Sequence, residues 1–239
     1  MSWTILDTGC KSAEENMEID ASLLDSIGEQ SAPILHLYDW IGKSATYGCL
    51  TKPEEFLNIH AMQEEGIALA KRPTGGGILF HIWDIAFSVL IPKTSSLFSL
   101  DTLKRYASIN SAVLQAVKTF LGPSYELDLI PIDFFPLSPP CQKFCMAQPT
   151  KYDVLYQGKK IVGAAQRKTK SGLLHQGTIS LLRPDVELIK KVLLKEKQEV
   201  AYAMGMHTFT LLDKDASEVD YLSARKEIKE LLIHYLTKL

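Results

Sequence analysis

The stretch Lys71-Arg72-Pro73-Thr74-Gly75-Gly76-Gly77-Ile78-Leu79-Phe80-His81-Ile82-Trp83-Asp84 places three consecutive glycines directly before an alternating apolar run. Each glycine loses more backbone entropy than other residues and brings no side chain to pack, so a triplet indicates a backbone that turns sharply or lies against another group. Exposed backbone N–H groups, together with the cations Lys71 and Arg72, favour a phosphate or a carboxylate as that group. The stretch predicts a ligand-binding loop; a hairpin turn with basic flanks is the alternative.

The common nucleotide-binding patterns do not fit this loop. Its glycines are contiguous rather than spaced as in the dinucleotide fingerprint, and they are not followed by the Gly-Lys-Ser/Thr of a phosphate loop. The composition is ordinary for a globular protein, with 46% hydrophobic and 23% charged residues and a net charge of -2. We therefore expect neither nucleic acid nor a membrane as a partner. The 239 residues are enough for one large domain, and we expect a single domain over 1–239.

The cysteines are too few for a disulfide framework in a chain of this length. They are Cys10, Cys49, Cys141 and Cys145. Cys141 and Cys145 are four residues apart, but no second Cys/His pair stands at ligand spacing, which argues against a zinc site. Because no cationic, apolar leader precedes Trp3, we expect a cytoplasmic protein.

Strand-like and helix-like patterns interleave along the chain. Strands are expected at 3–6, 33–38, 78–81, 85–90, 152–156, 159–162 and 178–182, and helices at 13–27, 51–64, 102–121 and, around a loop at Gly205, beyond 185. The helix at 51–64 is predicted from a capping box, Thr51-x-x-Glu54. Six prolines within 123–149 predict an irregular, functional or mobile loop. Hairpins outnumber crossovers, which indicates an α/β (α+β) fold with a mixed, largely antiparallel sheet flanked by helices.

Three sequence blocks carry a family resemblance. Arg72-x-Thr74-Gly75-Gly76-Gly77-x-x-x-His81 resembles the ligand loop of the lipoate-protein ligase A family, which shares a catalytic fold with biotin-protein ligases and lipoyl/octanoyl transferases. Gly158-Lys159-Lys160-Ile161-Val162-Gly163-Ala164-Ala165-Gln166 resembles the family's lysine motif, and Asn16-Met17-x-x-Asp20 is similar to its first helix. The blocks follow family order over about residues 3–182. The resemblance implies one catalytic domain, with no separate accessory domain apparent.

The resemblance also assigns roles in a ligand pocket. Residues implied to shape the pocket are Arg72, Thr74, Gly75, Gly76, Gly77, Ile78 and His81, and the small residues Gly163, Ala164 and Ala165 would let an acyl chain lie against a strand. Lys160 would bind near the acyl carbonyl oxygen. A fixed ammonium can stabilise charge on that oxygen or, with its pKa lowered by burial, take a proton. Without the matching context, a lysine in a hairpin is typically a solvated surface charge.

Cys145 bears on the reaction class. The run from Cys145 to Asp153 resembles the nucleophile loop of cysteine-dependent octanoyltransferases of the LipM type, in which the cysteine carries the acyl thioester. A reactive thiolate needs a nearby cation or base, and Lys160 is a candidate. The alternative is a buried, apolar cysteine. Asp153 fits either subfamily: ATP-dependent ligases have asparagine-aspartate here, with the acid helping to hold magnesium and phosphate, whereas Tyr152 precedes Asp153 in this chain.

Two positions depart from the family pattern. The family has an acid directly after the loop histidine, but here Ile82 follows His81 and the acid is Asp84, which leaves the part of His81 in ordering the loop open. The tripeptide His175-Gln176-Gly177 reverses the order of the first two residues found in the transferases. His175 is assigned to the pocket on that partial match, with a polar residue at a strand start as the alternative.

The implied activity is attachment of a lipoyl or octanoyl group to one lysine of a lipoyl domain, such as those of 2-oxoacid dehydrogenase E2 subunits or the glycine-cleavage H protein. We favour transfer from octanoyl-acyl-carrier protein through a Cys145 thioester over ATP-dependent ligation of lipoate through lipoyl-adenylate. ATP and Mg²⁺ would be needed only by the ligase, with Asp153 as the candidate metal residue; otherwise no metal is expected. A biotin-protein ligase and an inactive lipoyl-binding paralogue are further alternatives.

Overall fold

A seven-stranded mixed sheet forms the centre of the computed structural model, which describes residues 2–132 and 138–239. In spatial order its strands are β1 (Thr4–Lys11), β2 (Ile34–Trp40), β6 (Asp84–Pro92), β10 (Gly172–Ser180), β9 (Lys159–Lys168), β8 (Val154–Tyr156) and β7 (Leu127–Leu129). The pair β1 and β2 is parallel and every other neighbouring pair is antiparallel. The predicted fold class, a mixed and largely antiparallel sheet with helices, is confirmed.

A second sheet of three strands carries the glycine loop. Its order is β4 (Ile67–Lys71), β3 (Lys43–Tyr47) and β5 (Ile78–His81), so the loop at 72–77 joins the two outer strands. Strand β4 was absent from the sequence prediction. Its sequence, Ile67-Ala68-Leu69-Ala70-Lys71, has few of the residues that favour strands, since alanine and lysine are depleted there, and its pairing with β3 identifies it.

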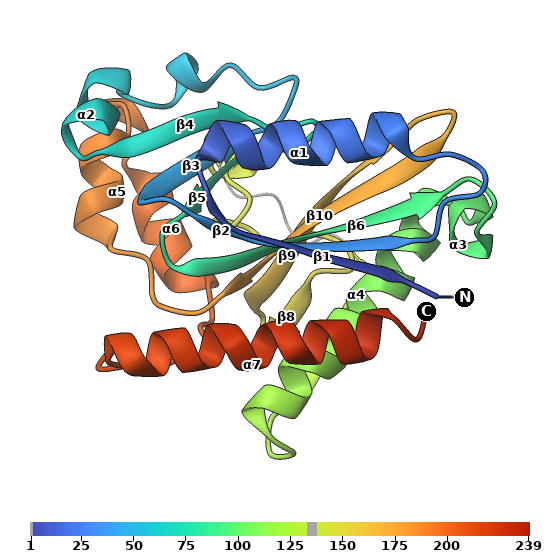
Figure 1. Ribbon diagram of the computed structural model, residues 1–239. Helices are drawn as coiled ribbons and strands as arrows, with labels where there is room; N and C mark the ends of the chain where they lie inside the picture. The colour runs from blue at the N-terminus through green and yellow to red at the C-terminus, as the bar shows by residue number, and fades with distance from the viewer. Residues whose placement is uncertain (1, 133–137) are drawn as a thin grey trace.

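Helices cover both faces of the large sheet (Figure 1). Helix α1 (Ala13–Ser26) crosses one face, while α4 (Thr102–Leu121) and α7 (Glu218–Leu236) pack together over the other. The shorter elements are η1 (Pro53–Glu55), α2 (Ile59–Glu64), α3 (Ser96–Ser99), η2 (Cys141–Lys143), α5 (Val186–Val192), η3 (Lys195–Lys197) and α6 (Glu199–His207). No helix in the described part of the chain is both long and apolar enough to cross a membrane.

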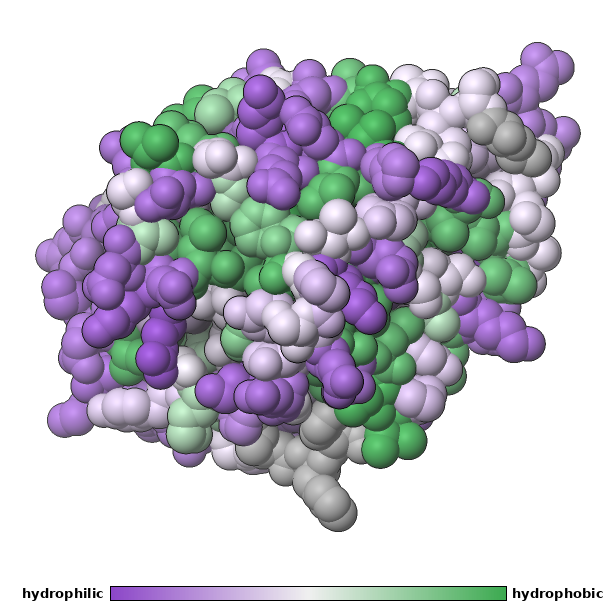
Figure 2. Space-filling view, turned by 90° about the horizontal axis from the view of Figure 1, so that it is seen from below, coloured by the Kyte–Doolittle hydropathy of each residue, from purple (hydrophilic) through white to green (hydrophobic). Residues whose placement is uncertain are grey.

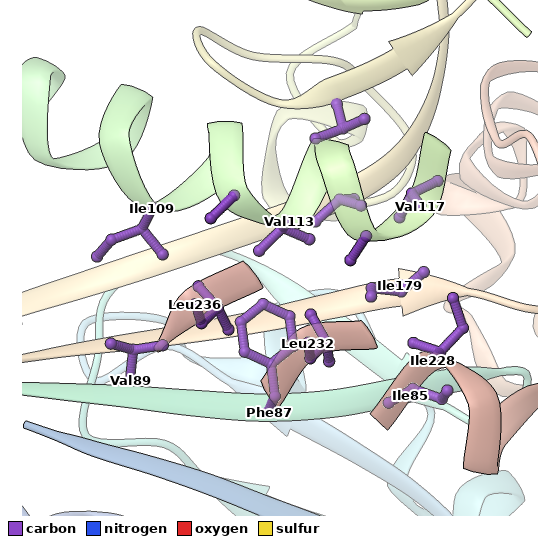
Figure 3. Packing of buried hydrophobic residues seen from close by; sticks show 14 of the residues in the cluster. Ile85, Phe87, Val89, Ile109, Val113, Val117, Ile179, Ile228, Leu232 and Leu236 are labelled. Atoms are coloured by element: carbon purple, nitrogen blue, oxygen red, sulfur yellow. The ribbon is translucent and has the colours of Figure 1, made fainter. Parts of the chain in front are cut away.

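The main core lies between the large sheet and the α4–α7 pair. Phe87 of β6 points into it, facing Val113 of α4 and Leu232 of α7 (Figure 3). The buried residues of α7 recur every four positions, which turns one side of the helix inward. They are Ala224, Ile228, Leu232 and Leu236. On the outer surface seen from below, hydrophilic and apolar residues are interspersed (Figure 2), as expected where the apolar sides of helices face inward.

Two predicted elements were wrong. The helix predicted over 51–64 is interrupted: η1 ends at Glu55, and α2 begins only at Ile59 with Asn58 as its N-cap. The Thr51 hydroxyl donates to the Gly76 carbonyl (2.9 Å) instead of capping a helix. The predicted loop around Gly205 is also wrong, since Gly205 lies inside α6. An added Cβ there would lie 3.1 Å from the Val186 side chain, so the glycine allows α5 and α6 to approach closely.

The proline-rich segment 123–149 is less irregular than predicted, because it contains β7 and η2, and its part near Cys145 is packed into the interior. Residues 141–147 include four buried side chains, namely Cys141, Phe144, Met146 and Ala147. The Cys145 amide donates to the Ile78 carbonyl (3.0 Å), which fixes the segment along β5. Residues 133–137 of the predicted loop lie outside the described residues. The part of the segment around Cys145 therefore forms one wall of the space between the two sheets.

Candidate active site

A narrow cavity of about 60 Å³ lies between the two sheets. One row of its lining crosses four strands in register: Gly163 of β9, Thr178 of β10, Ala86 of β6 and Tyr38 of β2. Neighbouring strands are about 4.8 Å apart, so three steps give a floor about 14 Å long. Small side chains at most of these positions leave room above the floor. The complete lining is Met17, Tyr38, Thr46, Arg72, Gly76, Leu79, His81, Ala86, Cys145, Gly163, Ala164, Ala165, Gln176, Gly177 and Thr178.

The narrow cavity meets a wider cleft of about 480 Å³. Gly76, Cys145 and Ala164 line both spaces, so they mark the junction between them. Lys160 lines only the wider cleft. An elongated apolar group in the narrow cavity would therefore place its polar end beside Cys145, where a second reactant can approach through the cleft.

The glycine loop is packed against the cysteine segment. Gly76 has a φ of +89°, which favours glycine, and a Cβ there would lie 2.8 Å from Arg72 Nη2 and 3.9 Å from Cys145 Sγ. A Cβ at Gly77 would lie 2.1 Å from the Lys143 carbonyl oxygen. The glycine loop therefore lies close against another group, as predicted, and part of that group is the backbone of the cysteine segment at Lys143.

Arg72 is buried beneath this loop. Its Nη2 donates to the carbonyls of Gly75 and Gly77, both at 2.8 Å, and lies 3.6 Å from Cys145 Sγ. A guanidinium keeps its charge at any physiological pH, so it is a permanent cation beside the sulphur. The sequence predicted Lys160 as the cation for this thiol; in the structure, Arg72 is the cation that contacts the sulphur itself.

Lys160 is 3% exposed, which is rare for a lysine without a partner. Its ammonium donates to the Cys145 carbonyl (2.7 Å) and pairs with Asp153 Oδ2 (2.7 Å). A Cβ at Gly163 would lie only 2.4 Å from Lys160 Cε, so the glycine makes room for the lysine side chain. An ammonium has three N–H donors. Two are accounted for, which leaves one for a group in the wider cleft.

Asp153, the candidate metal residue of the ligase alternative, is the partner of Lys160 in this structure. Burial raises the pKa of Asp153, while the Lys160 ammonium and two donors from Thr150 oppose that rise. The backbone N–H and hydroxyl of Thr150 both reach Oδ2, at 2.7 and 3.0 Å. Asp153 therefore holds Lys160 in place beside the cleft.

Thr74 anchors the glycine loop to the large sheet. Its hydroxyl donates to Gln176 Oε1 (2.6 Å), and the Gln176 amide donates to Asp20 Oδ2 (2.7 Å). Asp20 also accepts from the Ser88 hydroxyl (2.6 Å) and lies 2.8 Å from His36 Nδ1. Asp20, the acid of the Asn16-Met17-x-x-Asp20 block, is therefore a buried residue with three side-chain partners, and Gln176 links it to Thr74 of the glycine loop.

The acid missing after His81 is supplied by Asp84. Asp84 Oδ2 lies 2.7 Å from His81 Nδ1, across the turn between β5 and β6. The other ring nitrogen, Nε2, lies 2.9 Å from the Thr46 hydroxyl, and Trp40 stacks on the ring at 4.1 Å. His81 is therefore held from three sides and lines the cavity.

Four predicted pocket residues line neither the cavity nor the cleft, namely Thr74, Gly75, Ile78 and His175. Thr74 bonds to Gln176, and the Gly75 carbonyl accepts from Arg72. His175 is on the opposite face of β10, against Phe87 and Tyr106, because successive residues of a strand point to opposite faces. Burial lowers the pKa of His175 to about 3, so the ring is neutral. Its neighbour Gln176 faces the cavity instead. The side chain of Ile78 packs in a separate apolar cluster with Phe80 and Phe144, so Ile78 contributes only its carbonyl, which holds Cys145.

Comparison with known proteins supplies two relatives with the same description. Octanoyltransferase LipM of Geobacillus kaustophilus (strain HTA426) is 24% identical over 246 residues, which cover 98% of this chain and 88% of the relative. Octanoyltransferase LipM of Staphylococcus aureus (strain NCTC 8325 / PS 47) is 26% identical over 180 residues, 74% of this chain. The match spans 65% of the length of the S. aureus protein, slightly less than two thirds.

A solved structure and a family model agree with these relatives. The bi-partite lipoate protein ligase of Thermoplasma acidophilum, whose structure was analysed with its E2 lipoyl domain, has a TM-score of 0.73 and 22% identity, covering 100% of this chain and 83% of that chain. The model of the lipoyl protein ligase A/B catalytic domain matches residues 12–209, a range that includes the glycine loop, Cys145 and Lys160. The chain therefore belongs to the family of lipoyl protein ligase A/B catalytic domains.

Proposed function

We propose that this enzyme transfers an octanoyl or lipoyl group to a lysine amine of a lipoyl domain through a thioester on Cys145. The observation that carries the proposal is the position of Cys145 at the junction of the narrow cavity and the wider cleft. The acyl chain would occupy the cavity above Gly163 and Ala86, while the donor and then the acceptor approach through the cleft. The relatives described as octanoyltransferases support the same reaction.

The first step makes the acyl-enzyme. The Cys145 thiolate, beside the Arg72 guanidinium, attacks the acyl carbonyl of a thioester donor, the bond from the carbonyl carbon to the donor sulphur breaks, and the donor leaves as a thiolate. The Lys160 ammonium has one donor left for the acyl oxygen, where negative charge develops. Octanoyl-acyl-carrier protein is the donor that we propose.

The second step releases the product. The neutral amine of the acceptor lysine attacks the thioester carbon, the bond to sulphur breaks, and Cys145 returns as a thiolate. The amine nitrogen loses one proton as the amide forms. Lys160 lines the cleft, and we propose that the carboxylate of its partner Asp153 accepts this proton and later releases it to solvent. Lipoyl domains of E2 subunits and the H protein are the acceptors that we propose.

ATP-dependent ligation of lipoate is the second candidate, because the family and the similar T. acidophilum structure include ligases. A ligase would build its own acyl-adenylate and would not need the Cys145 thiol. The arrangement favours the transferase, since Asp153 is occupied by Lys160 and Thr150 while Arg72 lies on the sulphur. A cytoplasmic location stays a prediction.

One experiment separates the two candidates. Apo lipoyl domain is incubated with the protein and either octanoyl-acyl-carrier protein without ATP, or lipoate with ATP and Mg²⁺, and its intact mass is followed. We expect acylation without ATP that Cys145→Ala abolishes and that Cys10→Ala, a change at an exposed cysteine far from the cavity, leaves intact. Acylation that requires ATP and persists in Cys145→Ala would make the protein a ligase.

A further inference from the structure

A chain of buried polar contacts leads from the start of β6 to the sulphur of Cys145. Asp84 contacts His81 Nδ1 (2.7 Å), His81 Nε2 contacts the Thr46 hydroxyl (2.9 Å), and Arg72 Nη1 donates to that hydroxyl (3.3 Å). Arg72 Nη2 then lies 3.6 Å from Cys145 Sγ. The four residues before the cysteine are each no more than 6% exposed. No water can replace these contacts without entering the interior.

The two charged ends of this chain determine the direction of its outer hydrogen bonds. A guanidinium only donates, so the Thr46 oxygen accepts from Arg72. An ionised carboxylate only accepts, so His81 Nδ1–H donates to Asp84 Oδ2. The Thr46 hydroxyl and His81 Nε2, 2.9 Å apart, join the two ends. Each group thus fixes the orientation of the next.

Asp84 is itself held by its surroundings. The Thr178 hydroxyl donates to the same carboxylate oxygen, and Arg225 of α7 donates to the Asp84 backbone carbonyl (2.7 Å). Arg225 also pairs with Asp39 of β2. Helix α7 follows the region matched by the family model, which ends at residue 209. Asp84 is therefore held in place by Thr178 of the large sheet and by Arg225 of α7, a helix outside the matched region.

Building on the proposed function, we propose that Thr46, His81 and Asp84 are positioning residues that hold the Arg72 guanidinium against Cys145 and so keep a cation beside the reacting sulphur. They act through Arg72 and not through contact with the sulphur. A cation next to a thiol favours the thiolate. Without the Thr46 hydroxyl, Nη1 keeps only the backbone carbonyl of Thr46 as a partner in this chain (3.4 Å), so the guanidinium is held less firmly and its mean distance from the sulphur increases.

Other charged and titratable groups near Cys145 come from separate elements. Lys160 of β9 contacts the Cys145 carbonyl and is paired with Asp153. Tyr106 of α4 is raised by burial to a pKa of about 12, so it is neutral where the thiol is assayed. Within the described part of the chain, none of these side chains forms a hydrogen bond with Thr46, His81 or Asp84. A change at Thr46 therefore acts on the sulphur through Arg72.

The test is the rate at which iodoacetamide alkylates Cys145 between pH 5 and 10, followed by peptide mass mapping so that the other cysteines are scored separately. Thr46→Val removes the hydroxyl and keeps the shape, whereas Thr46→Ser keeps the hydroxyl. For Thr46→Val we expect the half-maximal rate to move up by about half a pH unit, equivalent to about threefold slower alkylation at pH 7. Thr46→Ser should follow the unchanged protein.

A second pair of variants keeps the test decisive if Thr46→Val fails to fold. Asp84→Asn retains an acceptor oxygen for His81 and should leave the pH profile nearly unchanged, while Asp84→Leu removes the acceptor and should shift the profile upward as Thr46→Val does. Profiles of Thr46→Val and Asp84→Leu that superimpose on that of the unchanged protein would overturn the proposal. Iodoacetamide needs no acyl donor, so this result is independent of whether the acylation assay succeeds.

Discussion

The substitution Gly163→Ala would displace Lys160 without removing it. The added methyl carbon would lie 2.4 Å from Lys160 Cε and 2.8 Å from Nζ. Non-bonded carbons settle at about 3.5–4.0 Å, so Cε must move by about 1.1 Å or more. If the ammonium moves with it, the 2.7 Å bond from Nζ to the Cys145 carbonyl lengthens to about 3.8 Å, outside the hydrogen-bonding range.

This displacement should affect rate more than stability. Losing a hydrogen bond to a charged group costs about 1.5–3 kcal/mol, and the flexible lysine can recover part of it, so the free energy of unfolding should fall by at most about that amount. Removing one donor to a developing oxyanion typically lowers kcat by about 10²–10³-fold. If Lys160 has the proposed role, Gly163→Ala should therefore remain folded while octanoyl transfer falls by about two orders of magnitude.

Two measurements check this expectation. The initial rate of octanoyl transfer to apo lipoyl domain is compared with the urea unfolding midpoint, in Gly163→Ala and in Gly28→Ala. Gly28 is a matched control because its φ is not in the left-handed region, and an added Cβ would only make an ordinary 3.9 Å contact with Ser31 Oγ. Equal transfer rates in the two variants would refute the proposed role of the Lys160 ammonium.

Three further expectations concern stability and can be checked by denaturant unfolding. Gly76→Ala should cost about 1–3 kcal/mol because φ is +89° and Arg72 leaves no space, and a smaller loss would contradict the tight packing. Asn58→Ala should cost about 1 kcal/mol, as the loss of the α2 N-cap, and an unchanged midpoint would argue against that cap. Burial lowers the pKa of His175 from its ordinary value of 6.5 to about 3. The contribution of the neutral ring to the free energy of unfolding is therefore fully present above pH 6.5, and about 1.4 kcal/mol of it is lost per pH unit as pH falls toward 3. His175→Gln should remove that part of the pH dependence, and an unchanged slope would contradict it.

The sequence predicted the features that local chemistry determines. The hairpin turn at Gln157 and Gly158 has positive φ at both residues, as a tight two-residue turn requires. The glycine triplet was recognisable as a site of close approach, and Gly76 and Gly77 have such contacts, whereas a Cβ at Gly75 would meet nothing within 4 Å. Gly163 was predicted to leave space for an acyl chain, and it also makes room for Lys160. The long helix predicted over 102–121 is α4, with these bounds.

What could not be predicted depends on contacts between distant segments. No pattern near Arg72 indicates that its guanidinium reaches Cys145, 73 residues further along the chain. The replacement of the missing acid by Asp84 depends on the turn between β5 and β6, which brings a residue three positions on back to His81. The face on which His175 lies could have been inferred from strand alternation, had Thr178 been placed in the cavity first.

The central claim is that Cys145 carries the acyl group, and the most direct measurement is the mass of the protein itself after rapid mixing with octanoyl-acyl-carrier protein, without ATP and without acceptor. We predict an increase by one octanoyl group, located on the peptide that contains Cys145, removed by hydroxylamine and lost on adding apo lipoyl domain. A protein that acylates lipoyl domains but never gains this mass, or gains it at another residue, would contradict the account.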